Sequence, residues 1–412
     1  MRAINGKTPL EAAKTEYLDS LAIGGVQGLL TVIDDGICPE TDSGVMSLLG
    51  YDPLRYYTGR GALEALGIGF MDIGENAVGF RINFASYNDA TGKLDRRTSR
   101  DLSLEEQQQL VTEIREAIDL SEFPDVESSI TGFGRHRGIV CFKSPTRTLS
   151  ANVSNTDPGF RKIGAFGVPN DDADSKNKPS ECKALDDSEA AKATEKLVNL
   201  YIQQSAKVLD RSEVNARRRA KGSLPANLLL FRDGGGKFLP MQPFAEKYNW
   251  SLSLFGQIPA EHGLCKLIGG NWHDARMKPG QTEEVYYREL AQDLRKDTSD
   301  VIVVHLKAAD EPGHDGFPEE KVRAIERMDS LFVRLLLKDG HPDDVYIVAS
   351  DHATPCELKI HSADRVPALV YSRALAADST HTFCEREAGI GGLPVGRAPE
   401  LLPYVNRALA GK

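Results

Sequence analysis

The chain has 412 residues, enough for two or three domains, and its 41% hydrophobic and 27% charged residues are typical of a globular protein. Acidic residues outnumber basic ones by 60 to 50, and the resulting charge of −10 excludes a nucleic-acid binder that relies on a general basic field. The sequence has neither the ~20 continuous apolar residues of a membrane span nor the apolar core of a secretory signal. We therefore expect a cytoplasmic protein with no nucleic-acid or membrane partner. The six cysteines form no CxxC pair and are interpreted as reduced packing residues.

The first part of the chain mixes helical and strand-like patterns. Helix-like LEAAKTEYLDSLA precedes the apolar run GLLTVI within the first 72 residues. Two strand-like segments, AVGFRINFASY and GIVCFKS, then flank a helix whose capping box is formed by Ser103 and Glu106. The polar stretch 169–181 indicates a surface loop, and a long helix is expected over about 187–209.

From Ala226 onward, short apolar runs recur, each followed by a turn or a helix. These runs are NLLLF, SLSLF, DVIVVHL, DVYIVAS and PALVYS. Because they are apolar on both faces, they predict buried parallel strands of a doubly wound sheet. A core-packed helix is predicted from residues at helical spacing, namely Val322, Ile325, Met328, Phe332 and Leu335. The expected architecture is an α/β core domain over 1–72 and 224–412, with a smaller α/β domain inserted at 73–223.

Histidines and acidic residues gather just after the last predicted strands. The candidate ligands are Asp310, His314, Asp351, His352 and His361. Open α/β sheets place their ligands at the carboxyl ends of the strands, so we expect these side chains to converge. Carboxylate and imidazole donors without thiolates suit Mn²⁺ or Zn²⁺, and two-metal sites of this kind carry out phosphoryl chemistry. His305 lies within an apolar run and is interpreted as a hydrogen-bonded core histidine.

A two-metal site of this kind requires a nucleophile, and the segment PETDSG offers the hydroxyls of Thr41 and Ser43. A hydroxyl is a poor nucleophile until a base or a metal lowers its pKa, and metal coordination would do so here. An ordinary hydrogen-bonding role in a turn is the alternative for Thr41.

Several motifs follow one another along nearly the whole chain. They are TDSGVMSLLGYDPLRYYTGRGALEALG, RINFAS, DRRTSR, VNARRRAKGSLPANLLLFRDGG, DEPGHDG and SDHATP followed by HSAD. Together they resemble the archaeal-type, 2,3-bisphosphoglycerate-independent phosphoglycerate mutases of the alkaline phosphatase superfamily. The resemblance implies an alkaline-phosphatase-like, doubly wound, mainly parallel core with an inserted substrate-binding lid. It also implies an isomerase of glycolysis and gluconeogenesis that interconverts 3-phosphoglycerate and 2-phosphoglycerate through a phosphothreonine.

The same resemblance implies roles for the candidate residues. Thr41 occupies the position of the nucleophile and is preferred over Ser43. Asp310, His314 and His361 correspond to one metal set, whereas Asp351, His352 and Thr41 correspond to the other. Two divalent cations are implied; Mn²⁺ is the expected metal, with Mg²⁺, Co²⁺ and Zn²⁺ left open.

A substrate with a phosphate and a carboxylate needs guanidinium and amide donors. The candidates in and beside the inserted segment are Arg60, Arg81, Asn83, Arg96, Arg97, Arg100, His136 and Arg137. For any single arginine, an ordinary surface charge is the alternative. Asp157 is a candidate acceptor of a glycerate hydroxyl proton, although a turn-forming role before proline is the favoured interpretation. Lys266 is expected to be the counterpart of the family's active-site lysine. If the inserted domain retains glycerate, the reaction is isomerisation; otherwise water takes the phosphoryl group.

Members of this family usually begin with an apolar strand that ends in a metal-binding aspartate, whereas this sequence passes from Met1 almost directly into GKTPLEAA. A truncated start is the favoured explanation. The chain as written is then expected to lack one ligand of the second metal set and an inner strand of the sheet. The alternative functions are a metal-dependent phosphatase or phosphonate hydrolase and a non-catalytic homologue. A homo-oligomeric state is left open.

Overall fold

The computed structural model describes the chain apart from residues 1–3, 71–73, 75, 171–176 and 411–412. The chain divides into two compact units. The first comprises Met1–Tyr56, Met241–Gln257 and Leu264–Lys412, and the second comprises Tyr57–Pro240 and Ile258–Gly263. The second unit is wider than the expected range 73–223, because α5 (Arg60–Gly67) and β8 (Leu228–Gly235) pack with β2 (Ala77–Asn88).

The first unit is an α/β structure with two three-stranded sheets. In one sheet β13 (Val366–Tyr371) lies between β1 (Gly25–Leu30) and β12 (Tyr346–Ala349), antiparallel to both. In the other, β9 (Leu252–Gly256) lies between β10 (Asn271–Asp274) and β11 (Val301–Val304), parallel to both. The α/β class is therefore confirmed, although PALVYS forms an antiparallel strand and only part of the expected parallel set is parallel.

One continuous helical segment covers both sheets of the first unit. It consists of α13 (Pro318–Arg327), the π-helical turn η3 (Met328–Val333) and α14 (Arg334–Lys338). Phe332 shares an apolar cluster with Ile302 and Val304 of β11, whereas Val333 shares one with Val348 of β12. The helix predicted from the spacing of Val322 to Leu335 is therefore present, and Met328, Phe332 and Leu335 contribute to an apolar core cluster as expected.

Strands β11 and β12 each have one unpaired edge. Among the described residues, β11 pairs only with β9 and β12 pairs only with β13. The apolar residues of both strands are accordingly half-buried, and Ile347 remains 37% exposed.

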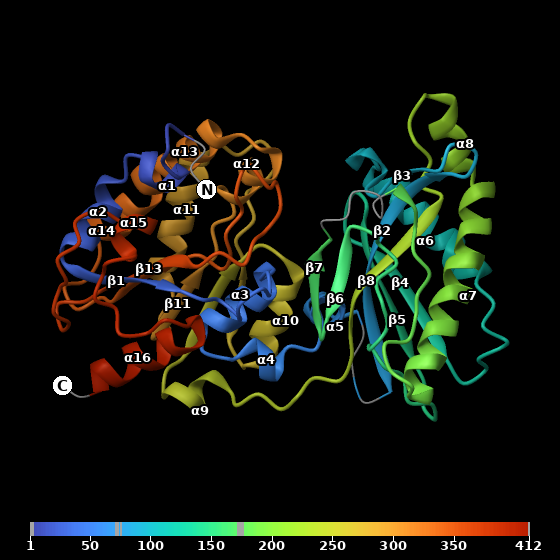
Figure 1. Cartoon of the computed structure of the whole chain (residues 1–412), viewed down its shortest axis with the longest axis horizontal. Helices are drawn as coiled ribbons and strands as arrows, with labels where there is room; N and C mark the ends of the chain where they lie inside the picture. Colours follow the sequence, from blue (N-terminus) through green and yellow to red (C-terminus); the bar gives the residue numbers. More distant parts are fainter. Residues whose placement is uncertain (1–3, 71–73, 75, 171–176, 411–412) are drawn as a thin grey trace. The chain divides into compact units, whose positions relative to one another are not determined.

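The second unit is built on an antiparallel sheet. Its order is β3 (Lys93–Asp95), β2, β5 (Arg137–Lys143) and β4 (Glu127–Gly132), with β8 also paired to β2. Helices α6 (Leu104–Ala117) and α7 (Glu189–Arg211) lie against one face of the sheet (Figure 1). NLLLF, expected as a parallel strand of the core domain, is part of β8 instead. Its residues are apolar on both faces because Leu229 and Phe231 point into the main core with α7, whereas Leu228 and Leu230 form a smaller apolar cluster with Ala85 and Leu94.

Residues of β2 alternate between the two faces of this sheet. Phe80, Ile82 and Phe84 point into the main core with Leu110 and Leu197. Because successive strand residues face opposite ways, Arg81 and Asn83 lie on the other face. Strand β2 is buried along most of its length. It therefore carries apolar residues toward α6 and α7 and polar residues toward α5.

The remaining elements complete the two units. In the first unit they are α1 (Pro9–Ala12), α2 (Glu16–Ile23), α3 (Thr41–Leu48), α4 (Pro53–Tyr56), α9 (Phe244–Tyr248), α11 (Glu283–Lys296), α12 (Asp310–Asp315), α15 (Glu385–Ala388) and α16 (Ala398–Ala410). In the second they are η1 (Thr98–Arg100), β6 (Phe160–Ile163), β7 (Phe166–Pro169) and α8 (Glu213–Ala220), while α10 (Pro259–Leu267) crosses the division.

Two local predictions are confirmed. The capping box of α6 forms, with Ser103 Oγ accepting from the Glu106 N–H and Glu106 accepting from the Ser103 N–H. The long helix expected over about 187–209 is α7. Residues 171–176 of the predicted surface loop lie outside the described residues. No helix in the described part of the chain is long and apolar enough to cross a membrane.

Candidate active site

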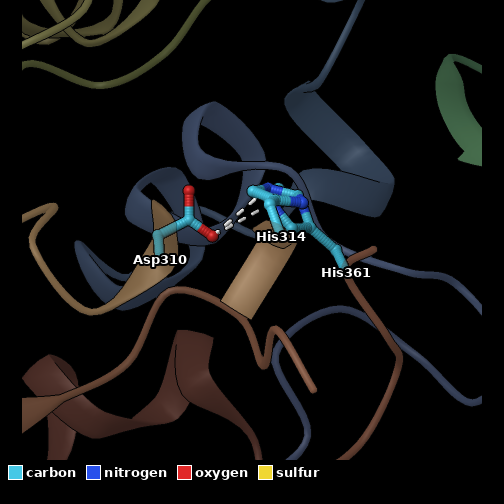
Figure 2. Close-up of side chains that lie close together, drawn as sticks. All are labelled: Asp310, His314 and His361. Carbon is cyan, nitrogen blue, oxygen red and sulfur yellow. Dashed lines mark hydrogen bonds and ion pairs between the residues drawn. The ribbon is translucent and has the colours of Figure 1, made fainter. Parts of the chain in front are cut away.

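Asp310, His314 and His361 form a compact donor cluster in the first unit (Figure 2). Asp310 and His314 lie on the short helix α12, and His361 comes from the loop after β12. Asp310 Oδ1 is 3.4 Å from His314 Nε2 and 3.5 Å from His361 Nε2, and the two imidazole nitrogens are 3.1 Å apart. One donor atom from each residue lies within 4.8 Å of the others. This carboxylate and imidazole set fits a divalent cation.

The carboxylate of Asp310 is held by contacts on both oxygens. Lys307 Nζ donates to Oδ2 at 2.8 Å, and the hydroxyl of Thr354 donates to Oδ1 at 2.7 Å. Burial alone would raise the pKa of Asp310, but the nearby His361 and Lys307 hold that pKa well below its usual range. Asp310 is therefore an anion, which is the form that ligates a metal.

Thr41, Asp351 and His352 meet beside this cluster. Thr41 begins helix α3 and is only 2% exposed, and its Oγ1 is 3.4 Å from His352 Nε2. The same imidazole nitrogen is 3.2 Å from Asp351 Oδ2. Gly44 makes this approach possible, because a Cβ at that position would lie 2.2 Å from the Asp351 carbonyl oxygen. The residues expected to share the second metal set are thus neighbours.

The two sets adjoin through their histidines. The rings of His352 and His361 stack with centroids 3.6 Å apart. Burial lowers the pKa of His352 to about 4, which leaves its imidazole neutral and able to ligate. Burial would lower the pKa of His361 as well, but the Glu40 and Asp310 carboxylates raise it above its ordinary value.

The two candidate hydroxyls differ in their surroundings. Ser43 Oγ donates to the Glu40 carbonyl oxygen at 3.0 Å and accepts from the Glu40 N–H at 3.1 Å, so it is used in capping α3. Thr41 Oγ1 instead faces His352. This geometry supports the preference for Thr41 over Ser43.

His305 was expected to be a core histidine but lies at the edge of the donor groups. It directly follows β11, and its Nε2 is 3.9 Å from Asp351 Oδ2. A position immediately after an apolar strand is where ligands gather in open α/β sheets, and that signal was available in the sequence.

A second cluster, of buried arginines, lies in the second unit. Strand pairing places Arg81 opposite Arg232 of β8 and Asn83 opposite Arg137 of β5. Glu64 of α5, 1% exposed, accepts from Arg60 Nε at 2.9 Å and lies 3.6 Å from Arg81. Burial alone would raise the pKa of Glu64, but Arg81 and Arg60 hold it low. Burial and the neighbouring Arg60 in turn lower the pKa of Arg81 to about 9.

The expected residues beside this cluster fall into different environments. Asp157 is fully buried and accepts from Arg96 Nε at 2.5 Å and from Asn83 Nδ2 at 3.4 Å. Burial and two arginines, Arg137 and Arg97, lower the pKa of His136 to about 2. Burial also lowers the pKa of Arg97, to about 10.

Asp157 also has a local turn role, because it accepts from the Gly159 N–H. The turn-forming alternative is therefore present together with the contacts to Arg96 and Asn83. Arg100, by contrast, is exposed.

Comparison with known proteins agrees with this geometry. A model of 2,3-bisphosphoglycerate-independent phosphoglycerate mutase matches residues 22–215, and a metalloenzyme superfamily model matches residues 269–392. The enzyme of that name from Aeropyrum pernix is 33% identical, over 98% of this chain and 95% of its own. The one from Saccharolobus solfataricus is 34% identical, over 98% of this chain and 94% of its own. The chain belongs to the 2,3-bisphosphoglycerate-independent phosphoglycerate mutase family.

Solved structures give the same relationship. A protein from Pyrococcus horikoshii matches with a TM-score of 0.76 and 25% identity, covering 99% of this chain and 93% of that one. A cofactor-independent phosphoglycerate mutase from Thermoplasma acidophilum matches with a TM-score of 0.60 and 28% identity, covering 98% and 94%. The fold expected from the resemblance is confirmed.

In this member of the mutase family, four residues at the two clusters were not singled out from the sequence. They are Glu64, Arg232, Lys307 and Thr354. Each lies within or next to a quoted motif, and Arg232 directly follows the apolar run NLLLF, but nothing local marks their contacts. Lys266, expected as the active-site lysine, is exposed on α10, whereas Lys307 is the lysine in contact with Asp310.

Proposed function

We propose that this chain is a metal-dependent isomerase that interconverts 3-phosphoglycerate and 2-phosphoglycerate, with Thr41 as the phosphoryl acceptor. The observation that carries the proposal is the buried Thr41 hydroxyl 3.4 Å from His352, next to a carboxylate and imidazole cluster suited to a cation. Family membership supports the same activity, since the relatives bear this enzyme's name. All six cysteines are buried thiols, which suits a reducing compartment, and we place the reaction in the cytoplasm.

The residues that would hold two divalent ions are those of the two sets. Asp310, His314 and His361 form one set, and Thr41, Asp351 and His352 form the other. When bound, such cations, with Mn²⁺ expected, lower the pKa of a hydroxyl and neutralise charge on a phosphoryl group.

Thr41 Oγ attacks phosphorus in line, the bond from phosphorus to the glycerate oxygen breaks, and the net reaction moves the Thr41 hydroxyl proton to that leaving oxygen. Phosphothreonine and glycerate result. The other glycerate hydroxyl then attacks the phosphothreonine, which releases Thr41 and gives the isomer. The position of Thr41 at the start of α3 adds the positive end of a helix dipole, which favours phosphate near its hydroxyl.

The arginine cluster of the second unit supplies the anion binding that an acidic protein needs. Arg60, Arg81, Arg137 and Arg232 lie near Glu64, and Arg232 also pairs with Asp233, so the guanidinium groups outnumber the carboxylates there. A substrate that carries both a phosphate and a carboxylate would balance that excess through charge-assisted hydrogen bonds. We propose that these residues, with Asn83, Arg96, Arg97, Arg100 and His136, bind phosphoglycerate and that Asp157 takes a glycerate hydroxyl proton.

Incubation of 3-phosphoglycerate with Mn²⁺ and the protein tests the function. Coupling to enolase measures 2-phosphoglycerate, and a parallel assay measures free phosphate. We expect Mn²⁺-dependent isomerisation and little phosphate, with phosphorylation of Thr41 detected by mass spectrometry. Thr41→Val should abolish both signals, whereas Ser43→Ala, which only removes a helix cap, should retain the phosphoenzyme.

Release of phosphate without the isomer would show a phosphatase on the same core. Absence of both products with Mn²⁺ bound would point to a non-catalytic homologue. Metal analysis of the same sample tests whether both sets hold an ion.

A further inference from the structure

Thr354 touches a member of each candidate metal set. It lies two residues after His352, and the side chain is buried, with 4% of the residue exposed. Its Oγ1 is 2.7 Å from Asp310 Oδ1 and 3.2 Å from His352 Nδ1. Asp310 belongs to the set with His314 and His361, whereas His352 belongs to the set with Thr41. One hydroxyl therefore bridges the two sets.

The chemistry of the three groups fixes the direction of both hydrogen bonds. An ionised carboxylate only accepts, so the single hydroxyl proton of Thr354 goes to Asp310. Thr354 Oγ1 then accepts, and His352 Nδ1 must be the donor. A neutral imidazole that carries its proton on Nδ1 has its lone pair on Nε2, which lies beside Asp351 Oδ2 and Thr41 Oγ1.

The same hydroxyl restrains the first set. Asp310 Oδ1 is the oxygen that faces His314 and His361, while Oδ2 is held by Lys307. Thr354 holds Oδ1 and Lys307 holds Oδ2, so the two contacts together limit rotation of the carboxylate. Ligating carboxylates are commonly held in this way by a partner that is not itself a ligand.

Thr354 is in turn fixed by its surroundings. Lys321 Nζ donates to the Thr354 carbonyl oxygen at 2.8 Å. Gly313 of α12 packs so closely that a Cβ there would lie 2.5 Å from the same oxygen. The backbone of Thr354 is thus held between α12 and α13, and its hydroxyl has a defined position.

We propose that Thr354 is a positioning residue that couples the two metal sets, by fixing the carboxylate of Asp310 and the tautomer of His352 through one hydroxyl. The proposal rests on the metal-dependent function proposed above. It predicts that loss of this hydroxyl weakens Mn²⁺ binding at both sets together, because each loses the restraint on one ligand.

The test compares Thr354→Val with Thr354→Ser by calorimetric titration with Mn²⁺ alone, without phosphoglycerate. We expect Thr354→Val to weaken Mn²⁺ binding 10–100-fold, the usual effect of losing such a partner, and Thr354→Ser to bind like the wild type. Thr380→Val is the matched control: Thr380 is also buried in the first unit, but its hydroxyl contacts Gln27 and Asp378. This control should leave Mn²⁺ affinity unchanged.

Nitrogen NMR of His352 in the wild-type chain and in Thr354→Ser gives a second readout. This measurement does not require that Thr354→Val folds. We expect the Nδ1-protonated tautomer in the wild-type chain and in Thr354→Ser. Observation of the Nε2-protonated tautomer would overturn the proposal, as would wild-type Mn²⁺ affinity in Thr354→Val. A chain that binds Mn²⁺ as predicted but does not isomerise phosphoglycerate would overturn the proposed function and leave this inference standing.

Discussion

The two units bury charged groups in opposite ways. In the first, the carboxylate of Asp310 and the imidazoles of His314 and His361 lie 3.1–3.5 Å from one another. In the second, Arg60 and Arg81 both contact the buried carboxylate of Glu64, and the neighbouring Arg232 pairs with Asp233. The first arrangement collects lone pairs and suits a cation; the second collects guanidinium groups and suits an anion. Buried charge is costly unless it is compensated, so each cluster indicates the charge of the ligand that it suits.

The two clusters also differ in the elements that carry their residues. The metal-binding candidates come from helices α3 and α12 and from the loop after β12, so their positions depend on contacts between these segments, such as those of Thr354. The arginines come largely from adjacent strands of one sheet, so the pairing register itself brings Arg81 next to Arg232. Substitutions in the two clusters should therefore affect different measurements.

The largest effect should come from His314→Ala in the first unit. It removes one of three donors, and we expect a fall in Mn²⁺ occupancy and a loss of turnover of at least about 10²–10³-fold, comparable to removal of one transition-state stabilising group. The circular dichroism spectrum should remain that of the wild type. His341→Ala, at an exposed loop position of the same unit, is the control and should retain both properties. Normal metal stoichiometry in His314→Ala would remove this residue from the set.

Arg97→Ala in the second unit should have a smaller effect, which falls on kcat/KM and not on metal binding. Loss of a charge-assisted contact worth ~1.5–3 kcal/mol implies a decrease in kcat/KM on the order of 10–100-fold. Mn²⁺ stoichiometry should not change, which separates this variant from His314→Ala. Arg217→Ala, an exposed arginine of the same unit, serves as the control. Unchanged kinetics would assign Arg97 to the ordinary surface arginines.

The smallest effect concerns the pH dependence of stability. Burial, Arg137 and Arg97 lower the pKa of His136 to about 2, whereas an unfolded histidine titrates near 6.5. As pH falls below 6.5, the unfolded chain takes up a proton that the folded chain does not. This histidine's contribution to stability is therefore complete above that pH and decreases below it, by up to ~1.4 kcal/mol per pH unit.

His136→Asn should accordingly lose less stability than the wild type between pH 7.5 and pH 5.5. Urea unfolding followed by circular dichroism measures the difference. His341→Asn should behave like the wild type. Equal pH dependence in His136→Asn and the wild type would mean that His136 is protonated in the folded chain.

In the first unit, the sequence predicts the candidate metal ligands better than the direction and pairing of the strands. Asp310, His314 and His361 could be recognised because polar residues after apolar strands gather at one sheet edge. The strand direction of PALVYS could not, since an apolar run buried on both faces has the same pattern in parallel and antiparallel sheets. The sequence also assigns NLLLF to the wrong unit, because apolar residues show that a strand is buried but not which neighbours bury it.

Most of the residues that the sequence did not indicate at the two clusters make their contacts with residues far away in the chain. Glu64 lies in GALEALG, where its helical spacing suggests an ordinary polar position, yet α5 turns it toward Arg81 of β2. Thr354 follows His352 closely, but its contact with Asp310 joins residues 44 positions apart. Such pairs are determined by packing between elements, which local patterns do not encode.

Among the residues that the structure describes, β11 and β12 each leave one edge unpaired, and these edges affect the behaviour of the chain in concentrated solution. Each edge presents N–H and C=O groups along an apolar segment, VIVV in one strand and YIVA in the other. An edge of this composition, without lysine or proline within the strand, is a template for pairing with a strand of another molecule. Self-association through these edges should therefore increase with protein concentration, and a lysine at Ile347, 37% exposed, should reduce it.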